Sequence, residues 1–279
     1  MPRELPSFDL VVATVGRVEE LGRLLDSLGA QIHRGFRVVV VDQNSDDRLD
    51  TVLAGSDLEL LRVRSEPGLS RARNAGLELV DADVVGFPDD DCAYPPDLLE
   101  RVATRLAERP ELSGVTGRVV GVDGASSSSW KADRALLDRA NLWNRASSAT
   151  TFLRRELVAR GGAFDEALGL GSGTRWDSAE EIDYLIRAVD SGARIEYDPA
   201  LVVEHALVPD DARIGYRDGA AVGYLLRKHR YPVRMRARML ARPVGGGLTS
   251  LARRDLARAR FHSATLRGRI RGLSGRRGP

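Results

Sequence analysis

The segment Phe36–Asp47, FRVVVVDQNSDD, joins a short apolar run to a strongly polar turn. The apolar part has the length of a strand, and its β-branched residues continue without alternation, which is typical of a strand buried on both faces. The run Phe8–Ala13, FDLVVA, has the same character and precedes apolar residues at helical spacing: Val18, Leu21, Leu24, Leu25 and Leu28. The chain is therefore predicted to begin with a strand, a helix and a second strand.

The same alternation continues to about residue 87. We predict a third strand at Leu58–Val63, a helix from Ser70 to about Leu79 and a fourth strand at Val84–Phe87. Strands that alternate with helices favour an α/β fold with a mostly parallel sheet covered on both faces, whose ligands bind beyond the carboxyl ends of the strands. Three polar turns should meet at that edge, namely Thr14–Arg17, Asp42–Asp47 and Asp89–Asp91.

The rest of the chain continues with shorter elements and ends in a helical, increasingly basic region after about Tyr216. We expect this region to be interrupted at Pro243–Gly247, because Pro243 is followed by four residues of which three are glycines. The other predicted elements are a helix at Leu98–Leu106, strands at Val115–Val122 and Thr150–Leu153, a short helix to about Arg160, a helix at Ser178–Val189, and strands at Ile195–Tyr197 and Leu201–Val203.

Composition and charge narrow the class of protein. The only cysteine is Cys92, which excludes an internal disulfide, and the start MPRELPSFDL lacks the apolar stretch of a secretory signal. No apolar run approaches the roughly 20 residues that span a bilayer, so we expect a cytoplasmic protein without a transmembrane helix. The charge is uneven, because Arg227–Pro279 holds 16 Lys and Arg residues and one acid, whereas the rest holds 26 and 39.

Asp89, Asp90 and Asp91 place three carboxylates within about 10 Å of extended chain. Their mutual repulsion grows where a neighbouring core lowers the dielectric, so a positive group should compensate them. A solvated acidic turn before Pro95 is the alternative interpretation.

The string from Ser65 to Glu100, SEPGLSRARNAGLELVDADVVGFPDDDCAYPPDLLE, resembles the family 2 glycosyltransferases, which carry a GLS-x-ARN-x-G segment followed by an aspartate-rich strand end. The resemblance extends over roughly Phe8–Val208 in family order. It implies a GT-A fold with one nucleotide-binding α/β domain over residues 1–215, a donor side at 1–122 and an acceptor side at 123–215. Residues 216–279 would form a basic helical extension.

The resemblance implies transfer of a sugar from a nucleotide-diphosphate donor, with Mn²⁺ or Mg²⁺ as the cofactor. The last carboxylate of the motif, Asp91, corresponds to the firmest metal ligand. Asp89 and Asp90 correspond to groups that contact the ribose or a metal-bound water. His205 lies where some relatives have an additional metal ligand, although a core or surface histidine is an equal alternative.

Nucleotide contacts are also implied by the resemblance. Thr14 and Arg17 match contacts in the first turn, and Asp42 matches an acid that accepts a hydrogen bond from the base. Gln43 departs from the common Asp-Asp pair, which leaves the identity of the base open. Arg73 falls on the ARN motif and suits bidentate recognition of phosphate, or else forms an ion pair with Asp89 or Asp90.

On the acceptor side, Glu180 and Glu181 fall at the family's Glu-Asp motif, which places Glu181 at the position of the general base. Because the side chain is longer than aspartate, the assignment could shift to Glu180. The competing interpretation is a capping box from Ser178 to Glu181, which would stabilise the start of a helix. Trp176 could stack on an acceptor sugar or simply close its loop.

The leading hypothesis is an inverting glycosyltransferase with a UDP, GDP or dTDP donor and a hydroxyl acceptor that is a glycan, lipid-linked or small molecule. The alternatives are a sugar nucleotidyltransferase and an inactive sugar-binding or nucleotide-binding relative. A sugar nucleotidyltransferase usually has a glycine-rich phosphate loop in its first strand–helix turn, whereas the corresponding segment here, ATVGRVEE, holds one glycine.

The basic extension predicts an anionic membrane surface as a partner, which would place the enzyme peripherally at the inner face of the membrane. A solvated tail, an acidic partner or a second subunit are the alternatives. Nucleic acid is not expected as a partner, because the rest of the chain is acidic.

Overall fold

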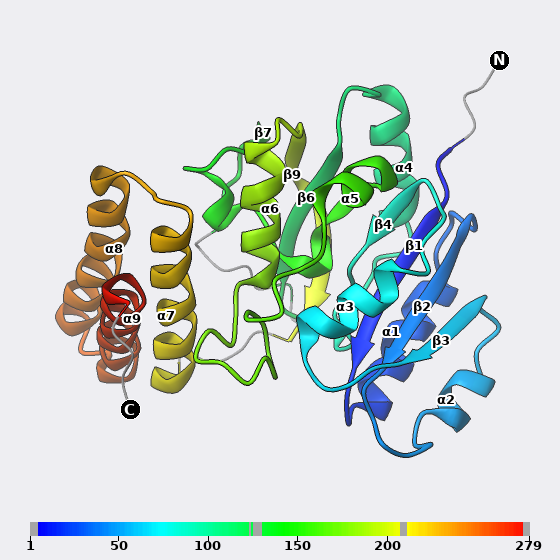
Figure 1. Ribbon diagram of the computed structural model, residues 1–279, viewed down its shortest axis with the longest axis horizontal. Helices are drawn as coiled ribbons and strands as arrows, with labels where there is room; N and C mark the ends of the chain where they lie inside the picture. Colours follow the sequence, from blue (N-terminus) through cyan, green and yellow to red (C-terminus); the bar gives the residue numbers. More distant parts are fainter. Residues whose placement is uncertain (1–4, 123, 125–129, 207–210, 276–279) are drawn as a thin grey trace. The chain divides into compact units, whose positions relative to one another are not determined.

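The computed structural model describes residues 5–122, 124, 130–206 and 211–275 (Figure 1). The chain divides into two compact units, which are described separately. The first comprises Met1–Phe164 and Tyr184–Leu207 and holds the sheet, and the second comprises Asp165–Asp183 and Val208–Pro279 and is mainly helical. Residues 165–183, expected on the acceptor side of the first domain, thus group with the C-terminal helices.

The first half of the sheet is parallel and follows the predicted apolar runs. Its strand order is β3-β2-β1-β4, and every neighbouring pair in it is parallel. These strands are β1 (Phe8–Thr14), β2 (Phe36–Asp42), β3 (Leu60–Arg64) and β4 (Val84–Gly86). This confirms the predicted α/β class with a parallel core.

The second half is mixed, and the described residues form a nine-stranded sheet in all. Strand β8 lies antiparallel between β4 and β6, β6 pairs with β9 in parallel, and two short strands flank β9 in antiparallel orientation. The bounds are β5 (Cys92–Ala93), β6 (Gly114–Val120), β7 (Ala135–Leu136), β8 (Phe152–Arg154) and β9 (Ile195–His205).

Two predicted strand boundaries differ from the structure. The strands expected at 195–197 and 201–203 are one continuous strand, β9, because its pairing with β6 jumps from Tyr197 to Val202. The extra residues bulge out of the ladder, and Pro199 is tolerated there because it need not donate a ladder hydrogen bond. The strand expected from Thr150 starts at Phe152, after a 3₁₀ turn at Ser148–Thr150.

Helices cover both faces of the sheet. Helix α1 (Val18–Gly29) buries the predicted leucines, and α4 (Leu98–Glu108) joins the same apolar cluster as Leu10 and Val12 of β1. Helix α3 (Leu69–Leu77) packs on the other face. A Cβ on its Gly76 would lie 2.4 Å from a methyl carbon of Val11, so this glycine permits close packing. The first unit also contains α2 (Asp50–Ala54), α5 (Arg155–Gly161), a 3₁₀ helix (Leu142–Asn144) and residues 184–190 of α6 (Glu180–Asp190).

Three helices form most of the second unit, namely α7 (Ala212–Lys228), α8 (Val233–Ala252) and α9 (Leu256–Ser274), drawn from yellow to red in Figure 1. Helices α7 and α9 approach each other through glycines. A Cβ on Gly219 would lie 2.4 Å from the carbonyl oxygen of Thr265, and one on Gly268 would lie 2.2 Å from that of Tyr216. Only glycine allows such close contact of the two backbones.

The interruption expected at Pro243–Gly247 is wrong, because α8 runs without a break through these residues. A proline inside a helix frees the carbonyl four residues earlier, here that of Met239. The Arg269 guanidinium of α9 donates a hydrogen bond to this carbonyl. Gly246 also packs against His262, where a Cβ would lie 2.5 Å from the ring. Packing against α9 therefore compensates the poor helix propensity of this stretch.

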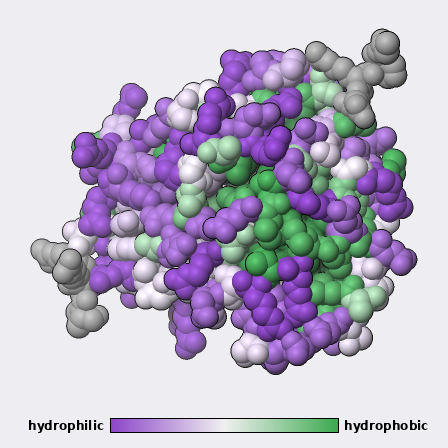
Figure 2. Space-filling view, turned by 45° about the vertical axis from the view of Figure 1, so that its right-hand side comes forward, coloured by the Kyte–Doolittle hydropathy of each residue, from purple (hydrophilic) through white to green (hydrophobic). Residues whose placement is uncertain are grey.

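The surface has an uneven distribution of polarity. Figure 2 shows hydrophobic residues gathered near the middle of one face, with hydrophilic residues around them. Within the part of the chain that the structure describes, no helix is both long and apolar enough to cross a membrane.

Candidate functional site

The carboxyl ends of the parallel strands bring the predicted donor-side residues together. Thr14 and Asp42 end β1 and β2 and lie opposite each other in the ladder. Between β1 and α1 the chain turns at Gly16, whose φ of 70° is in the left-handed region, and the Gly16 N–H donates to Oδ1 of Asn44 at 2.7 Å. Asn44 is a site residue that sequence reasoning missed, and it holds the first turn against the second.

The three adjacent carboxylates pair with two arginines. Asp89 accepts from the Arg73 guanidinium at 3.1 Å and from the Ser148 hydroxyl at 3.1 and 3.2 Å. Asp90 and Asp91 share Nη1 of Arg17, at 2.9 and 2.6 Å respectively. Protein cations therefore compensate the charge that the sequence left unexplained.

The environments of Asp90 and Asp91 shift their pKa values in opposite directions. Burial raises the pKa of Asp90 and outweighs the opposing effects of Thr14 and Arg17. Burial also acts on Asp91, but His205 and Arg17 outweigh it and lower its pKa. Asp91 is thus held as a carboxylate. The Thr14 hydroxyl is buried beside Asp90, whose pKa it lowers, and it has no hydrogen bond of good geometry among the described residues.

Strand pairing brings His205 to the acidic turn. His205 ends β9 and pairs with Cys92 of β5, directly after Asp91. Its Nε2 lies 2.9 Å from Oδ1 of Asp91 and 3.8 Å from Oδ2 of Asp89, and its Nδ1 lies 2.8 Å from the carbonyl oxygen of Ala206. The hydrogen bond with Asp91 raises the pKa of His205 to about 9, so the ring is an imidazolium at neutral pH.

The donor set at Asp91 and His205 fits a divalent cation that brings further ligands with it. Two neighbouring ligands on an octahedron with bonds of about 2.1 Å lie about 3 Å apart, which matches the 2.9 Å between Oδ1 and Nε2. No group of three or more His, Cys, Asp or Glu side chains within the described ranges is arranged to hold a metal. Mg²⁺ typically takes one or two carboxylates and completes its shell with phosphates and water. Binding would displace the imidazole proton.

Asp42 has little remaining capacity for hydrogen bonds. Its Oδ1 accepts from the backbone N–H and the side-chain amide of Asn44, and its Oδ2 accepts from Nε and Nη2 of Arg62. A carboxylate offers about four lone-pair sites, and all are in use. The predicted contact with a nucleotide base would have to replace one of these hydrogen bonds.

Arg73 forms the ion pair that was the alternative to a phosphate contact. It is 2% exposed, pairs with Asp89, and lies over the Phe164 ring at 5.6 Å. Asn74 next to it exchanges two hydrogen bonds with the backbone of Phe164, at 2.7 and 3.1 Å. Arg73 and Asn74 of the ARN motif thus connect α3 to Asp89 of the acidic turn and to Phe164, the last residue of the segment Met1–Phe164 of the first unit.

Glu180 and Glu181 lie in the second unit, in the first turn of α6 (Glu180–Asp190). Glu180 is 5% exposed and Glu181 is half-buried, so Glu181 is the more accessible carboxylate. The carbonyl of Ala179 receives a helical hydrogen bond from the N–H of Asp183, so the helix begins one residue later than a capping box from Ser178 to Glu181 would place it. The capping interpretation of Glu181 stays a prediction. Ala179 has a φ of 66°, an uncommon value for a non-glycine residue.

A buried ion cluster fixes the first turn of α6 within the second unit. Asp183 is fully buried, and its Oδ1 lies 2.6 Å from Nζ of Lys228 and 2.7 Å from Nε2 of His229. Lys228 also lies 2.7 Å from Asp165. Burial alone would raise the pKa of Asp183, but the hydrogen bonds from His229 and Lys228 lower it to about 2. Sequence reasoning gave Asp183 no role.

Trp176 stacks on Tyr224 of α7, with ring centroids 4.6 Å apart, and Arg175 lies 5.5 Å from its ring. This contact is the one expected of a residue that closes its loop. Stacking on an acceptor sugar stays a prediction.

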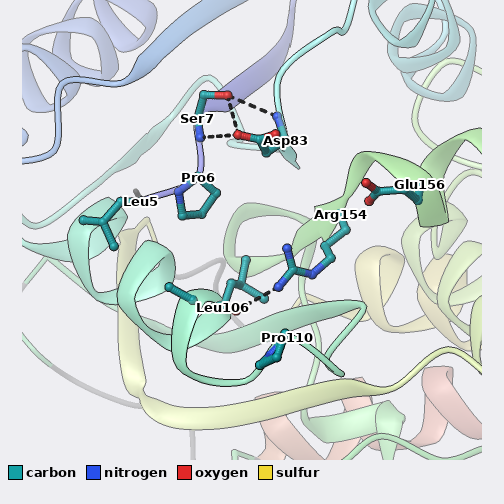
Figure 3. Close-up of a pocket in the computed structure, with 9 residues that line it drawn as sticks. Leu5, Pro6, Ser7, Asp83, Leu106, Pro110, Arg154 and Glu156 are labelled. Atoms are coloured by element: carbon teal, nitrogen blue, oxygen red, sulfur yellow. Dashed lines mark hydrogen bonds between the residues drawn. The ribbon is translucent and has the colours of Figure 1, made fainter. Parts of the chain in front are cut away.

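The open groove in Figure 3 is not part of this site. Its cavity volume is about 630 Å³, and it lies where β1 and β4 begin, at the opposite edge of the sheet from the acidic turn. Ser7 and Asp83 line one side and are hydrogen-bonded to each other, and Arg154 lies across from them (Figure 3).

The sequence matches the family model described as glycosyl transferase family 2 over residues 9–167, more than half of the chain. The chain belongs to this family. It is 29% identical over 226 residues to a pre-mycofactocin glycosyltransferase of Mycobacterium tuberculosis (strain CDC 1551 / Oshkosh), which covers 76% of this chain and 44% of that protein. The chain therefore spans less than half the length of this relative.

Solved structures support the same fold. The mannosyltransferase PcManGT from Pyrobaculum calidifontis, in complex with GDP-Man and Mn²⁺, has a TM-score of 0.69 at 17% identity, covering 98% of this chain and 88% of that one. Residues 1–349 of S. aureus TarS, in complex with UDP-GlcNAc, have a TM-score of 0.62 at 18% identity, covering 92% and 91%. The GT-A-like α/β fold expected from the sequence is confirmed.

Proposed function

We propose that this chain transfers a sugar from a nucleotide-diphosphate donor to a hydroxyl acceptor and inverts the anomeric carbon. The observation that carries the proposal is the cluster of Arg17, Asp90, Asp91 and His205 at the carboxyl edge of the parallel strands, in a chain that belongs to glycosyltransferase family 2. Ligands of such sheets bind at this edge.

Asp91 and His205 would hold a divalent cation together with the donor diphosphate. When bound, Mn²⁺ or Mg²⁺ stabilises the negative charge that develops on the leaving group. Arg17 is about half exposed, so its guanidinium can turn from the carboxylates to a phosphate oxygen. The Thr14 hydroxyl, buried beside Asp90, would supply a further polar contact once the donor displaces that carboxylate.

Glu181 would accept the proton of the acceptor hydroxyl. As this proton moves to the carboxylate, the hydroxyl oxygen bonds to the anomeric carbon, and the bond from that carbon to the diphosphate oxygen breaks with its electron pair. A single displacement of this kind inverts the configuration. The greater exposure of Glu181 favours it over Glu180 for contact with an acceptor.

The structural relatives indicate the class of donor but not which nucleotide it carries. The two solved structures named above are complexes with GDP-Man and with UDP-GlcNAc, and we infer a nucleoside diphosphate sugar as the donor here. We further propose a cytoplasmic enzyme whose basic C-terminal region meets an anionic membrane surface, where a lipid-linked acceptor would be found.

The decisive experiment is donor turnover with Mn²⁺ or Mg²⁺ by the wild type and by Asp91→Asn. We expect the variant to lose turnover by about a hundredfold or more while keeping its melting temperature, because it loses one ligand charge at a partly exposed strand end. Asp57→Asn, at an exposed position away from this edge, is the matched control. Wild-type turnover in Asp91→Asn would refute the metal role. Release of pyrophosphate from a sugar phosphate and a nucleoside triphosphate would indicate a nucleotidyltransferase instead.

A further inference from the structure

Helix α8 has two apolar faces, and only one of them is packed. Met235, Met239, Pro243 and Ser250 form the buried face, which packs against α9. A second set of apolar residues recurs at intervals of three and four along the whole helix and is exposed: Val233, Ala237, Ala241, Val244, Leu248 and Leu251. Residues at this spacing lie on one side of a helix, so they form a continuous strip, here called the α8 strip.

The exposure of the α8 strip is large for aliphatic side chains. Val233 is 78% exposed, Leu248 65% and Leu251 54%. Single exposed apolar residues need no explanation, but a contiguous row of them marks an interaction surface. The other side of the same helix already supplies its packing, so the strip is not required for the core of this unit.

A row of arginines borders the α8 strip. Arg234, Arg238 and Arg242 follow one another at intervals of four, are exposed, and form no ion pair among the residues that the structure describes. Helix α8 contains no Asp or Glu at all. Burial and, to a smaller extent, the charge of Arg238 one turn away lower the pKa of Arg242. Two further exposed arginines, Arg253 and Arg254, follow the helix.

The combination of an exposed apolar strip and a row of arginines indicates which kind of partner fits α8. A second copy of the chain that met this face through its own α8 would bring another row of arginines against the first, and like charges disfavour that contact. Nucleic acid would neutralise the arginines but would leave the valines and leucines of the strip in water. An anionic bilayer surface accommodates both features, because aliphatic side chains enter the acyl boundary while arginines meet the lipid phosphates.

We propose that the α8 strip and the arginine row of Arg234, Arg238 and Arg242 dock this protein on an anionic lipid surface, with α8 lying in the plane of the interface. The proposal rests on the proposed function in one respect: it assigns the membrane contact proposed there to one face of α8, where an enzyme held in this way would meet a lipid-linked acceptor. The docking itself does not require catalysis.

The experiment is co-sedimentation of the full chain with vesicles of phosphatidylglycerol and phosphatidylcholine in equal amounts, and with vesicles of phosphatidylcholine alone. We expect binding to the anionic vesicles that weakens as salt is raised. Arg234→Gln/Arg238→Gln/Arg242→Gln should weaken it by about tenfold or more. Leu248→Ser/Leu251→Ser should weaken it to a similar extent without changing the net charge.

The matched control is Arg23→Gln/Arg34→Gln/Arg160→Gln, which removes three exposed arginines from the sheet unit. It should bind vesicles as the wild type does. Equal loss in this control, unchanged binding by either α8 variant, or no binding by the wild type at low salt would overturn the proposal. So would a dimer that Leu248→Ser/Leu251→Ser dissociates, or duplex DNA that outcompetes the vesicles.

Turnover of a soluble donor, measured without vesicles, separates this inference from the proposed function. The α8 variants should keep that turnover and lose only vesicle binding. Loss of vesicle binding with normal turnover supports docking, whereas absent turnover with normal vesicle binding would count against the transferase and leave docking supported.

Discussion

Three adjacent aspartates are compatible with a folded strand end because each side chain has its own cation or shares one. Arg73 compensates Asp89 from a buried position, whereas Arg17 reaches Asp90 and Asp91 from a partly exposed one. A buried pair cannot be broken without leaving an uncompensated charge, but an exposed guanidinium can leave at low cost. We therefore expect Asp89 to keep its ion pair with Arg73 when a ligand binds, and Asp91 to exchange its contact with Arg17 for the ligand.

Glu181→Gln tests the acceptor side. We expect loss of sugar transfer by about a hundredfold or more with donor affinity unchanged, because a base acts on the acceptor and contributes little to nucleotide binding. Transfer assays and nucleotide titrations check this result. Glu180→Gln is the matched control, since it changes the more buried neighbour. Normal transfer combined with a lower melting temperature in Glu181→Gln would show that this residue only stabilises α6.

The charge on Asp183 makes the stability of the helical unit depend on pH. Its folded pKa of about 2 is below the unfolded value of about 3.9. The stabilisation is therefore complete above about pH 4 and is lost as pH falls toward about 2. Asp183→Asn should lower the free energy of unfolding by about 2 kcal/mol near neutral pH and by much less near pH 2.

Urea unfolding of wild type and Asp183→Asn across this pH range checks the prediction. Asp190→Asn, which removes an exposed carboxylate at the other end of the same helix, is the control. A penalty for Asp183→Asn that is the same at both ends of the range would contradict the assignment of the low pKa to the contacts with Lys228 and His229.

At the scale of elements, a proline in α8 is tolerated because another helix satisfies the carbonyl that it frees. Arg269→Leu should destabilise the unit by about 1–3 kcal/mol, since the Met239 carbonyl then loses its donor. Pro243→Ala restores a helical N–H for that carbonyl, so the cost of Arg269→Leu should fall by about 1 kcal/mol in that background.

A double-mutant cycle from denaturant unfolding measures this coupling. Arg267→Leu, an exposed arginine on the same helix, is the control and should show no coupling to Pro243→Ala. Additive effects of Arg269→Leu and Pro243→Ala would mean that the hydrogen bond does not compensate the proline.

At the scale of the whole molecule, the donor and the cation should stabilise the fold together. We expect UDP, GDP or dTDP to raise the melting temperature in the presence of Mn²⁺, because a ligand that binds only the folded state stabilises it by mass action. EDTA should remove most of the increase, and Asp91→Asn should show the same loss. Thermal unfolding with each nucleotide checks this. An equal increase with and without EDTA would mean that nucleotide binding does not involve a metal.

The parallel core could be predicted from the sequence because its strands are uniform apolar runs. Phe8–Ala13 and Phe36–Val41 lie within β1 and β2, and the polar turns that follow them lie at one edge of the sheet, as expected. The family motif and the acidic turn were also evident from local sequence. The pattern of apolar residues within a strand follows which of its side chains are buried, so a run of a few residues is enough to predict that strand.

Other features depend on residues far apart in the chain, and only the tertiary structure decided them. Ser148 lies 59 residues from Asp89, to which it donates, and no local pattern marks it. His205 reaches Asp91 through the pairing of β5 with β9, and α8 passes Pro243 because Arg269 lies beside it. The local sequence predicts that a proline within a helix or a buried charge lowers stability. Which group compensates that loss depends on the tertiary packing.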